Sequence, residues 1–280
     1  MRQTARSRPS LIEMHDFSQL LEESIERPFS GWNFSYDGRI SSTFPWDFAS
    51  IVGSHARHSP NMLDMGTGGG EWLSRLPFRP RSTKATESWE ANVPVARKRL
   101  SSLGIEVIQV ESAPDNVDQD SRSGGGLLPF PDGSFHLVTN RHEAFVATEV
   151  ERILALGGRF LTQQVESGFS DNFRRLLGVP IQPISIRPWA LELSLIQIRK
   201  AGLRVEASGE GSEIISFADV GALAWYLKSF PRLFPDFSAE IFRAPLHRLH
   251  LLIEREGPLT VHQRLFWLDS RKPLPSATSS

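Results

Sequence analysis

Residues 63–71 read Leu63-Asp64-Met65-Gly66-Thr67-Gly68-Gly69-Gly70-Glu71. A short apolar run at 62–65 comes directly before the glycines, and a helical pattern at 71–76 follows them. Glycines directly after a strand allow a tight turn, and they let a ligand lie against bare backbone because no Cβ is in the way. The spacing is Gly-x-Gly-x-Gly, which differs from the Gly-x-Gly-x-x-Gly of dinucleotide-binding folds. The stretch therefore predicts a strand, a ligand-binding turn and a helix.

An acidic residue follows the next predicted strand. Glu87 comes directly after a short strand expected to end at Thr86, about 20 residues beyond the first glycine. An acid at this distance can accept two hydrogen bonds from ribose hydroxyls. The alternative is a glycine turn with an unrelated surface glutamate. The strand before the loop, the helix after it and the acid in place together favour a ligand-binding site.

Strands and helices alternate from residue 61 onward. Helices are expected at 91–103, 148–156 and 190–201, and each is followed by glycine: Gly104, Gly157 with Gly158, and Gly202. Strands are expected at 105–110, 135–139, 159–165 and 261–268. This alternation predicts a parallel sheet covered on both faces. We therefore expect an α/β fold with a doubly wound sheet.

Additional segments flank this core. Asp16 is expected to cap a helix that ends before Pro28, and the aromatic stretch 29–48 has no clear period. We interpret that stretch as irregular packing or a short helical cap.

Two insertions are expected. Residues 114–126 are polar and end in glycines, so we expect this segment to be mobile. Residues 216–238 carry an inserted helix at 218–230, before a final helix at 239–255 and the last strand.

Composition excludes several classes of protein. Lysine and arginine total 31 against 32 for aspartate and glutamate, so the net charge of −1 gives no global positive field that would attract a nucleic acid. The chain has no cysteine, which excludes disulfides, thiolate zinc sites and cysteine nucleophiles and fits a cytoplasmic protein. No stretch approaches the roughly 20 apolar residues that a membrane span needs. We expect no metal site.

Four segments, in the same order along the chain, resemble motifs of one enzyme family. They are residues 63–70, Ala85-Thr86-Glu87, Leu128-Pro129-Phe130-Pro131-Asp132-Gly133-Ser134-Phe135-His136-Leu137-Val138, and Glu149-Val150-Glu151-Arg152-Ile153-Leu154 followed by Gly157-Gly158-Arg159-Phe160. On these segments the chain resembles the class I S-adenosylmethionine (SAM) dependent methyltransferases, particularly the group that includes the UbiE-like enzymes. It departs from the family pattern at His136, which replaces the usual acid before the fourth strand.

The resemblance implies a Rossmann-like, doubly wound sheet of seven strands that is mostly parallel and has an antiparallel last strand. It also implies SAM as the cofactor and assigns roles to residues of the core. Asp64 would act near the methionine amino group of the cofactor, and Glu87 would hold the ribose hydroxyls. Trp89 would cover one side of the adenine, and Glu111 or the nearby backbone would meet the adenine amino group. The other residues expected at the cofactor are Gly66, Thr67, Gly68, Gly70 and Asn140.

The end of the fourth strand carries the catalytic candidates. Methyl transfer from a sulfonium is an in-line displacement with an activated donor, so the protein must mainly position the acceptor and exclude water. A hydroxyl or carbon acceptor also needs a proton removed. The strand ends in Thr139-Asn140-Arg141-His142-Glu143, at the edge where ligands gather. His142 and Glu143 are therefore the acid–base candidates; the alternative is that Glu143 caps the next helix and His142 is a structural hydrogen bonder.

Substrate contacts are expected outside the shared core. The aromatic segment 14–48 and the insertion 216–238 flank an active edge that needs a cover, because a methyl donor must be kept from water. We expect both segments to close the pocket, and core packing is the alternative. The residues expected to contact the substrate are Trp32, Tyr36, Trp46, Gln164, Trp225 and Tyr226, with a buried structural amide as the alternative for Gln164.

The expected organisation is a tail and cap at 1–60, a SAM-binding core at 61–215, an inserted lid at 216–240, a C-terminal helix and last strand of the core at 241–272, and a tail at 273–280. The expected function is SAM-dependent methyl transfer to an oxygen, nitrogen or carbon of a small molecule. The absence of an Asn-Pro-Pro-Tyr or Asp-Pro-Pro-Tyr motif argues against a base-amino methyltransferase. The alternatives are an RNA- or protein-directed methyltransferase, and a protein that keeps the fold without methyl transfer. The oligomeric state stays open.

Overall fold

The computed structural model describes residues 11–114, 116, 126–181, 188–231, 234 and 237–275, with side chains from residue 17 onward. Most of the insertion that we expect to be mobile lies outside the described residues, as do the chain ends at 1–10 and 276–280. No helix within the described ranges is long and apolar enough to cross a membrane.

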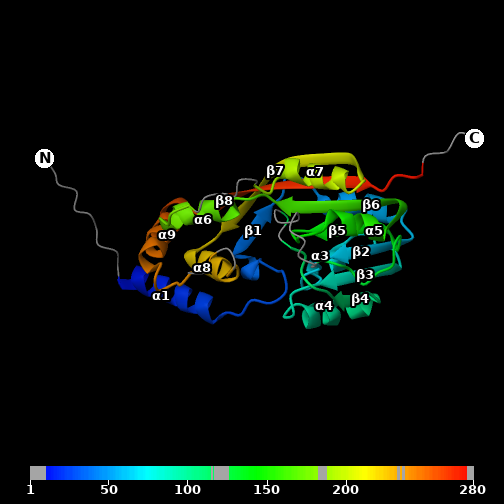
Figure 1. Ribbon diagram of the computed structural model, residues 1–280. Helices are drawn as coiled ribbons and strands as arrows, with labels where there is room; N and C mark the ends of the chain where they lie inside the picture. The colour runs from blue at the N-terminus through cyan, green and yellow to red at the C-terminus, as the bar shows by residue number, and fades with distance from the viewer. Residues whose placement is uncertain are drawn as a thin grey trace, which may run out of the picture.

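A mixed sheet of eight strands forms the centre of the molecule, in the order β1-β7-β8-β6-β5-β2-β3-β4 (Figure 1). The strands are β1 (Ile40–Thr43), β2 (Asn61–Met65), β3 (Ser82–Glu87), β4 (Glu106–Gln109), β5 (Phe135–Arg141), β6 (Leu154–Val165), β7 (Arg204–Phe217) and β8 (Leu259–Arg271). β4, β3, β2, β5 and β6 are parallel neighbours. β8 is antiparallel to both β6 and β7, and β1 is antiparallel to β7.

The eighth strand is a correction to the expected seven-stranded sheet. It is β1, which comes from the aromatic stretch interpreted as irregular or helical. Only Ile40 of its four residues is buried, so the strand has no apolar alternation to reveal it. Its structure comes from pairing with the outer edge of β7, where Ile40 faces Phe217 and Thr43 faces Ile214.

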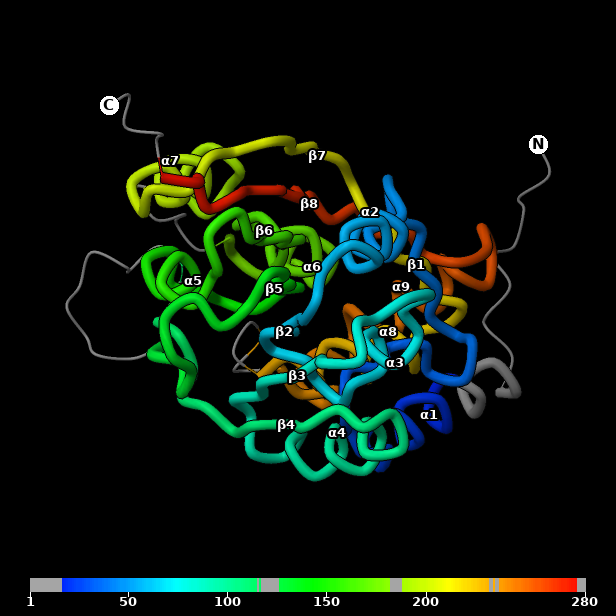
Figure 2. Tube along the Cα trace, turned by 90° about the vertical axis from the view of Figure 1, so that its right-hand side faces the viewer, coloured from blue at the N-terminus to red at the C-terminus, as the bar shows by residue number. Residues whose placement is uncertain are grey.

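Helices cover both faces of the parallel half, as the alternation predicts. The helices are α1 (Leu11–Glu26), α2 (Phe48–Ala56), α3 (Glu71–Arg75), α4 (Val93–Leu100), α5 (Ala147–Ile153), α6 (Phe169–Leu177), α7 (Leu191–Lys200), α8 (Val220–Lys228) and α9 (Arg243–Glu256). Figure 2 shows α2, α3 and α4 on one side of the strands and α5 and α7 on the other. Each side has its own hydrophobic core, one around Phe48, Leu73 and Leu100 and the other around Phe145 and Phe160.

Several expected boundaries differ from the structure. The first helix begins at Leu11, upstream of the expected cap at Asp16. The helix expected at 148–156 ends at Ile153, and β6 starts at Leu154, so Gly157 and Gly158 lie inside a strand. A Cβ on Gly158 would lie 2.8 Å from the Ala155 carbonyl oxygen, and so the strand start itself requires this glycine.

Beyond the carboxyl ends of the parallel strands, β7 and β8 continue as a two-stranded extension. The pairing of β6 with β8 stops at Val165 opposite Leu265, but β7 and β8 remain paired as far as Phe217 opposite Leu259. The extension carries β1 and the helices α1, α6, α8 and α9, which stand apart from the sheet's own helices in Figure 1. We call this assembly the cap.

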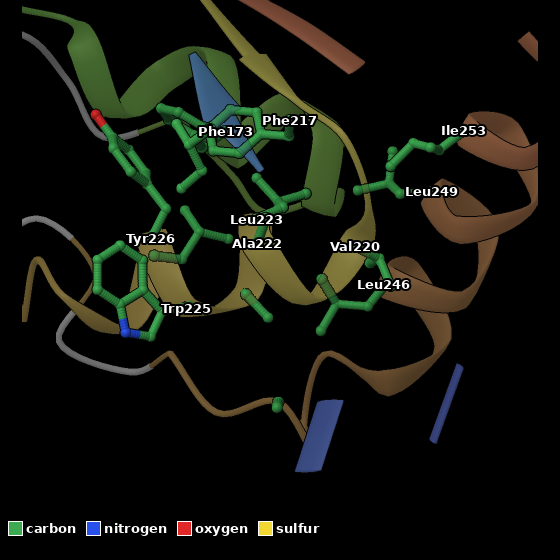
Figure 3. Close-up of a cluster of buried hydrophobic side chains, with 14 of the residues drawn as sticks. Phe173, Phe217, Val220, Ala222, Leu223, Trp225, Tyr226, Leu246, Leu249 and Ile253 are labelled. Carbon is green, nitrogen blue, oxygen red and sulfur yellow. The ribbon is translucent and has the colours of Figure 1, made fainter. Parts of the chain in front are cut away.

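A separate hydrophobic core fills the cap. Figure 3 shows it around α8, with α9 residues at one end and Trp225 and Tyr226 at the other. Every residue of α8 from Val220 to Leu227 is buried, so this helix is the cap's central element. We expected the last helix to belong to the sheet's core, but α9 packs against α8. The buried residues of this cap core include Phe17, Leu21, Phe173, Leu177, Phe217, Leu223, Leu246, Leu249 and Ile253.

Polar contacts fasten the N-terminal segment to α8. The Arg39 guanidinium donates to both oxygens of Asp219 at 2.6 Å, and Asp219 also accepts the Ala222 amide as the N-cap of α8. At the other end of α8, the Lys228 ammonium donates to the carbonyls of Ser24, Ile25 and Arg27. Both ends of the central helix therefore hold the segment 24–39 in place.

Candidate functional site

The glycine loop lies between β2 and α3, where the carboxyl ends of the parallel strands meet. We call this side of the sheet the carboxyl edge. Gly66, Gly68 and Gly70 have left-handed φ angles of 67°, 62° and 78°. A Cβ on Gly66 would lie 2.5 Å from Cγ of Glu143, and one on Gly68 would lie 2.8 Å from Cβ of Trp32. A Cβ on Gly70 would lie 2.8 Å from Leu100 of α4. The first two glycines therefore face the candidate site, whereas the third permits α3 and α4 to pack closely.

Glu87, at the end of β3, is hydrogen-bonded to the backbone of this loop. Its side chain accepts the Gly68 amide at 2.6 Å and the Trp89 amide at 2.8 Å. Burial raises the pKa of Glu87, while these backbone bonds favour its charged form. Each carboxylate oxygen can accept a second hydrogen bond. Glu87 thus holds the loop in position and retains acceptor capacity.

Asp64 occupies the centre of the edge, two residues before the first glycine. Only 2% of it is exposed, and it accepts a hydrogen bond of 2.8 Å from the Thr139 hydroxyl of the neighbouring strand. Burial raises its pKa to about 6. The buried Thr67 hydroxyl of the loop faces Asp64 and, like Thr139, favours its charged form.

A small pocket opens beside the loop. Its cavity volume is about 20 Å³, which is little more than a water molecule requires and far below the roughly 300 Å³ of a small ligand pocket. Trp32 and Glu143 already touch the glycine backbone, so they occupy space that a ligand on this loop would need. The pocket is lined by Met65, Gly66, Thr86, Ser88, Val110, Glu111, Ala113, Gly126, Leu128, Glu143, Ala144, Val146 and Glu149.

The two acid–base candidates are consecutive in sequence but contact different groups. Glu143 lies against Gly66 and accepts a 3.2 Å hydrogen bond from the Ser88 hydroxyl. His142 has a left-handed φ of 60°, and its Nε2 lies 2.8 Å from Nε2 of Gln163. Glu143 therefore lies against the glycine loop, whereas His142 is part of a separate group of polar side chains.

The polar group around His142 also includes Trp46, from the segment between β1 and α2. Trp46 donates its indole N–H to Oε1 of Gln163 at 2.7 Å. Burial and the neighbouring Arg141 lower the pKa of His142 well below its usual value. His142 is therefore a neutral imidazole near pH 7.

Asn140 and Gln164 form a buried hydrogen-bond network on the face of the sheet opposite to Gln163. Nε2 of Gln164 lies 2.6 Å from Oδ1 of Asn140, and the Thr162 hydroxyl donates to the same oxygen at 2.9 Å. Gln164 is therefore a buried, hydrogen-bonded amide. Nδ2 of Asn140 is buried and has no acceptor among the residues that the structure describes.

The expected substrate aromatics divide into two groups. Trp32 lies on the glycine loop and Trp46 on Gln163, both at the carboxyl edge. Tyr36, Trp225 and Tyr226 are instead buried in the cap core, with Tyr36 packed on Trp225 at a ring-centroid distance of 4.9 Å.

Trp89, expected to cover the adenine, is 44% exposed. Phe29 of the N-terminal segment stacks on its ring, with the ring centroids 6.0 Å apart.

Two residues at the site escaped the sequence reasoning. Glu71 lies under the loop, paired with Arg99 at 3.1 Å, and its other oxygen is buried without a partner among the described residues. Arg141 ends β5 within the same pentapeptide as His142 and Glu143. Its position beyond a parallel strand was a usable signal, since charged groups there face the ligand edge. The described residues contain no cluster of side chains able to hold a metal ion.

Solved structures resemble this fold at low sequence identity. The YcgJ protein of Bacillus subtilis is 18% identical with a TM-score of 0.53, covering 81% of this chain and 98% of its own. A protein of Bacillus halodurans C-125, assigned as a methyltransferase, is 18% identical with a TM-score of 0.52 and covers 80% of this chain and 98% of its own.

A geranyl diphosphate methyltransferase in complex with SAM is 14% identical, with a TM-score of 0.43, over 80% of this chain and 84% of that one. No family model matches the chain, and no curated protein matches its sequence. The fold is therefore the Rossmann-like α/β fold of methyltransferases, with a mixed sheet of eight strands.

Proposed function

We propose that this protein is a SAM-dependent methyltransferase that acts on a small molecule. The observation that carries the proposal is the glycine loop at the carboxyl edge, where Gly66 and Gly68 turn bare backbone toward the site and Glu87 supports the loop from below. Such a loop serves a ligand with a ribose and a charged tail better than it serves packing alone.

The side chains around the glycine loop have the chemistry and the positions that SAM binding would require. Glu87 has acceptor positions left for ribose hydroxyls, and Asp64 can attract the methionine ammonium group. The 20 Å³ pocket, with Glu111 on its wall, lies in the direction expected for adenine. Trp32 must move from Gly68 to admit the cofactor, and its 37% exposure leaves room for that movement. The cofactor, when bound, supplies an activated methyl group on a sulfonium.

The chain's own residues would then position the acceptor and keep water out. We assign Glu143 the role of proton acceptor, because it lies beside Gly66 where the reacting groups would meet. We assign His142 the role of hydrogen-bond donor, since a neutral imidazole with one nitrogen engaged by Gln163 is poorly suited to take up a proton there. The cap would cover the site in this proposal, with parts of the N-terminal segment 1–60 and the insertion 216–240 contributing to it.

A small acceptor fits the cap better than a macromolecule does. The N-terminal segment lies directly on the loop, tied down where the Gly31 amide donates to Oδ1 of Asn92 at 3.0 Å. A macromolecular substrate would have to displace this segment. The near-neutral net charge of −1 also gives no general attraction for RNA.

The test is methyl transfer from SAM carrying a labelled methyl group to three pools: a small-molecule extract, total RNA and total protein. We expect label in a small molecule together with S-adenosylhomocysteine (SAH). Label found only in RNA or protein would contradict a small-molecule substrate and support an RNA- or protein-directed methyltransferase. SAM binding without label in any pool would support a fold retained without methyl transfer.

A further inference from the structure

We propose that Arg141 and His142 form an acceptor subsite that binds the carboxylate of a small organic acid. The inference rests on the proposed function, since it names the substrate class of that same site. It is carried by two hydrogen-bond donors, on consecutive residues at the end of β5, that have no acceptor among the residues that the structure describes.

Arg141 is a half-buried arginine without a partner. Its guanidinium lies 5.4 Å over the Phe44 ring, and it makes no hydrogen bond or ion pair with any residue that the structure describes. Two other half-buried arginines are paired with carboxylates: Arg39 donates to both oxygens of Asp219, and Arg159 donates to both oxygens of Asp269. A half-buried guanidinium whose N–H groups have no partner in the described part of the chain can donate to an incoming anion.

His142 supplies the second donor. An indole N–H can only donate, so the 2.7 Å contact with Trp46 fixes Oε1 of Gln163 toward the indole. The Gln163 amide nitrogen therefore faces His142 and donates to Nε2 at 2.8 Å. A neutral imidazole whose Nε2 accepts must carry its proton on Nδ1. Trp46 thus acts through Gln163 to hold His142 as an Nδ1–H donor.

The neighbouring charges are carboxylates at longer range. Asp64 and Glu213 both favour the charged form of Arg141 electrostatically, but neither is close enough to form an ion pair with it. Burial raises the pKa of both carboxyls, which weakens their competition with an incoming anion.

The subsite belongs to the acceptor side of the centre. Phe44 and Trp46 come from the segment between β1 and α2, and Glu213 comes from the β7 extension that carries the cap. The glycine loop contributes none of these residues. A guanidinium and an N–H on consecutive residues can each donate to one oxygen of a carboxylate, and the aromatic rings suit an apolar body attached to it.

The experiment titrates acetate and benzoate, with benzamide as the neutral isostere, into the protein with and without saturating SAH. Binding is followed by calorimetry and by ¹⁵N NMR. We expect both carboxylates to bind, and benzamide to bind at least about tenfold more weakly than benzoate. Arg141→Gln should weaken benzoate binding about tenfold or more and leave the SAH affinity within about twofold.

Arg57→Gln is the matched control, because Arg57 also lies over an aromatic ring, that of Phe78 at 5.2 Å, but away from this site. It should change neither affinity. Equal binding of benzoate and benzamide, or no binding of either carboxylate, would overturn the subsite. Loss of SAH affinity in Arg141→Gln with benzoate binding unchanged would assign Arg141 to the cofactor's own carboxylate and also overturn it. Absence of SAH binding by the unaltered protein refutes the proposed function, while the titrations without SAH still decide the carboxylate site.

The tautomer of His142 is a second readout that needs no ligand. The ring-nitrogen shifts should report a neutral Nδ1–H form between pH 6 and 8. Trp46→Phe removes the indole donor, frees the Gln163 amide to turn over, and should introduce the Nε2–H tautomer. An Nε2–H or protonated His142 in the unaltered protein would refute the donor assignment.

Discussion

At the scale of single residues, the carboxyl edge of the sheet is distinguished by buried acidic side chains. Asp64 has no cationic partner within hydrogen-bond distance among the described residues, and the Thr139 hydroxyl is the donor it contacts. Burying a carboxylate with so little compensation costs stability when the group is ionised. Such a cost is typical of a functional site, where a ligand completes the interaction.

The first prediction is that Asp64→Asn stabilises the protein above neutral pH. The pKa of Asp64 is raised to about 6 in the folded state, against about 3.9 in an unfolded chain. Its stabilising contribution is therefore fully present below about pH 4 and is lost as the pH rises through about 6. At pH 8 the free energy of unfolding of Asp64→Asn should exceed that of the unaltered protein by about 3 kcal/mol, with little difference near pH 4.

Urea denaturation at a series of pH values checks this, with exposed Glu240→Gln as the control expected to show no change. A less stable Asp64→Asn at pH 8 would contradict the assignment.

Sequence motifs found these residues but not their burial. Glu87 was expected to be a strand-end acid outside the core, yet 5% of it is exposed and its oxygens hold the amides of Gly68 and Trp89. Replacing Glu87 with alanine would therefore disturb the loop as well as any ribose contact. Spacing along the chain identifies a residue, whereas its hydrogen bonds depend on how the loop folds back onto it.

At the scale of elements, local pattern predicted the parallel half well and the cap side poorly. β2, β3, β5 and α4 follow clear periods and glycine stops. β7 has no such period, because Gly209 and Gly211 interrupt it. A Cβ at these glycines would meet Trp267 at 2.5 Å and Pro45 at 2.7 Å, so the glycines are there to admit bulky neighbours from other segments. A constraint of that kind is invisible without the tertiary structure.

The second prediction concerns the junction of β1 with α8. Arg39 binds both oxygens of Asp219 in a fork that lysine cannot reproduce. Arg39→Lys should lower the free energy of unfolding by about 1–3 kcal/mol. The control is Arg204→Lys, in an ion pair with Glu206 whose arginine is 66% exposed, where the loss should stay below about 0.5 kcal/mol. Chemical denaturation measures both, and equal losses would contradict the structural role of the Arg39 fork.

At the scale of the whole molecule, the cap is assembled from three distant parts of the chain. Phe17 and Leu21 from the N-terminus, Phe173 from the middle and Leu246 from the C-terminal third share one core. Contacts of such long sequence separation leave no local pattern. This is why the sequence predicted a cap over the edge but described its parts as a separate N-terminal cap and an inserted lid.

The third prediction is that removing residues 1–48 prevents the cap from folding. The deletion removes α1 and β1, uncovers Leu223 and Phe217, and leaves an unpaired edge on β7. The truncated chain should aggregate, or lose its cooperative unfolding transition, in size-exclusion chromatography and thermal denaturation. A monomeric truncated protein with an unchanged midpoint would show that the cap core does not need the N-terminal segment.

Calorimetric titration of SAH into the protein and two matched glycine variants tests the central claim most directly. Gly68 and Gly104 have similar left-handed φ angles of 62° and 67°, but a Cβ on Gly68 meets Trp32 at 2.8 Å, whereas one on Gly104 meets nothing within 4 Å. The unaltered protein and Gly104→Ala should bind SAH with a micromolar dissociation constant, about −8 kcal/mol. Gly68→Ala should bind at least about tenfold more weakly, because the added methyl group occupies the ligand's place on the loop. No binding by the unaltered protein, or equal binding by all three, would contradict a cofactor site at this loop.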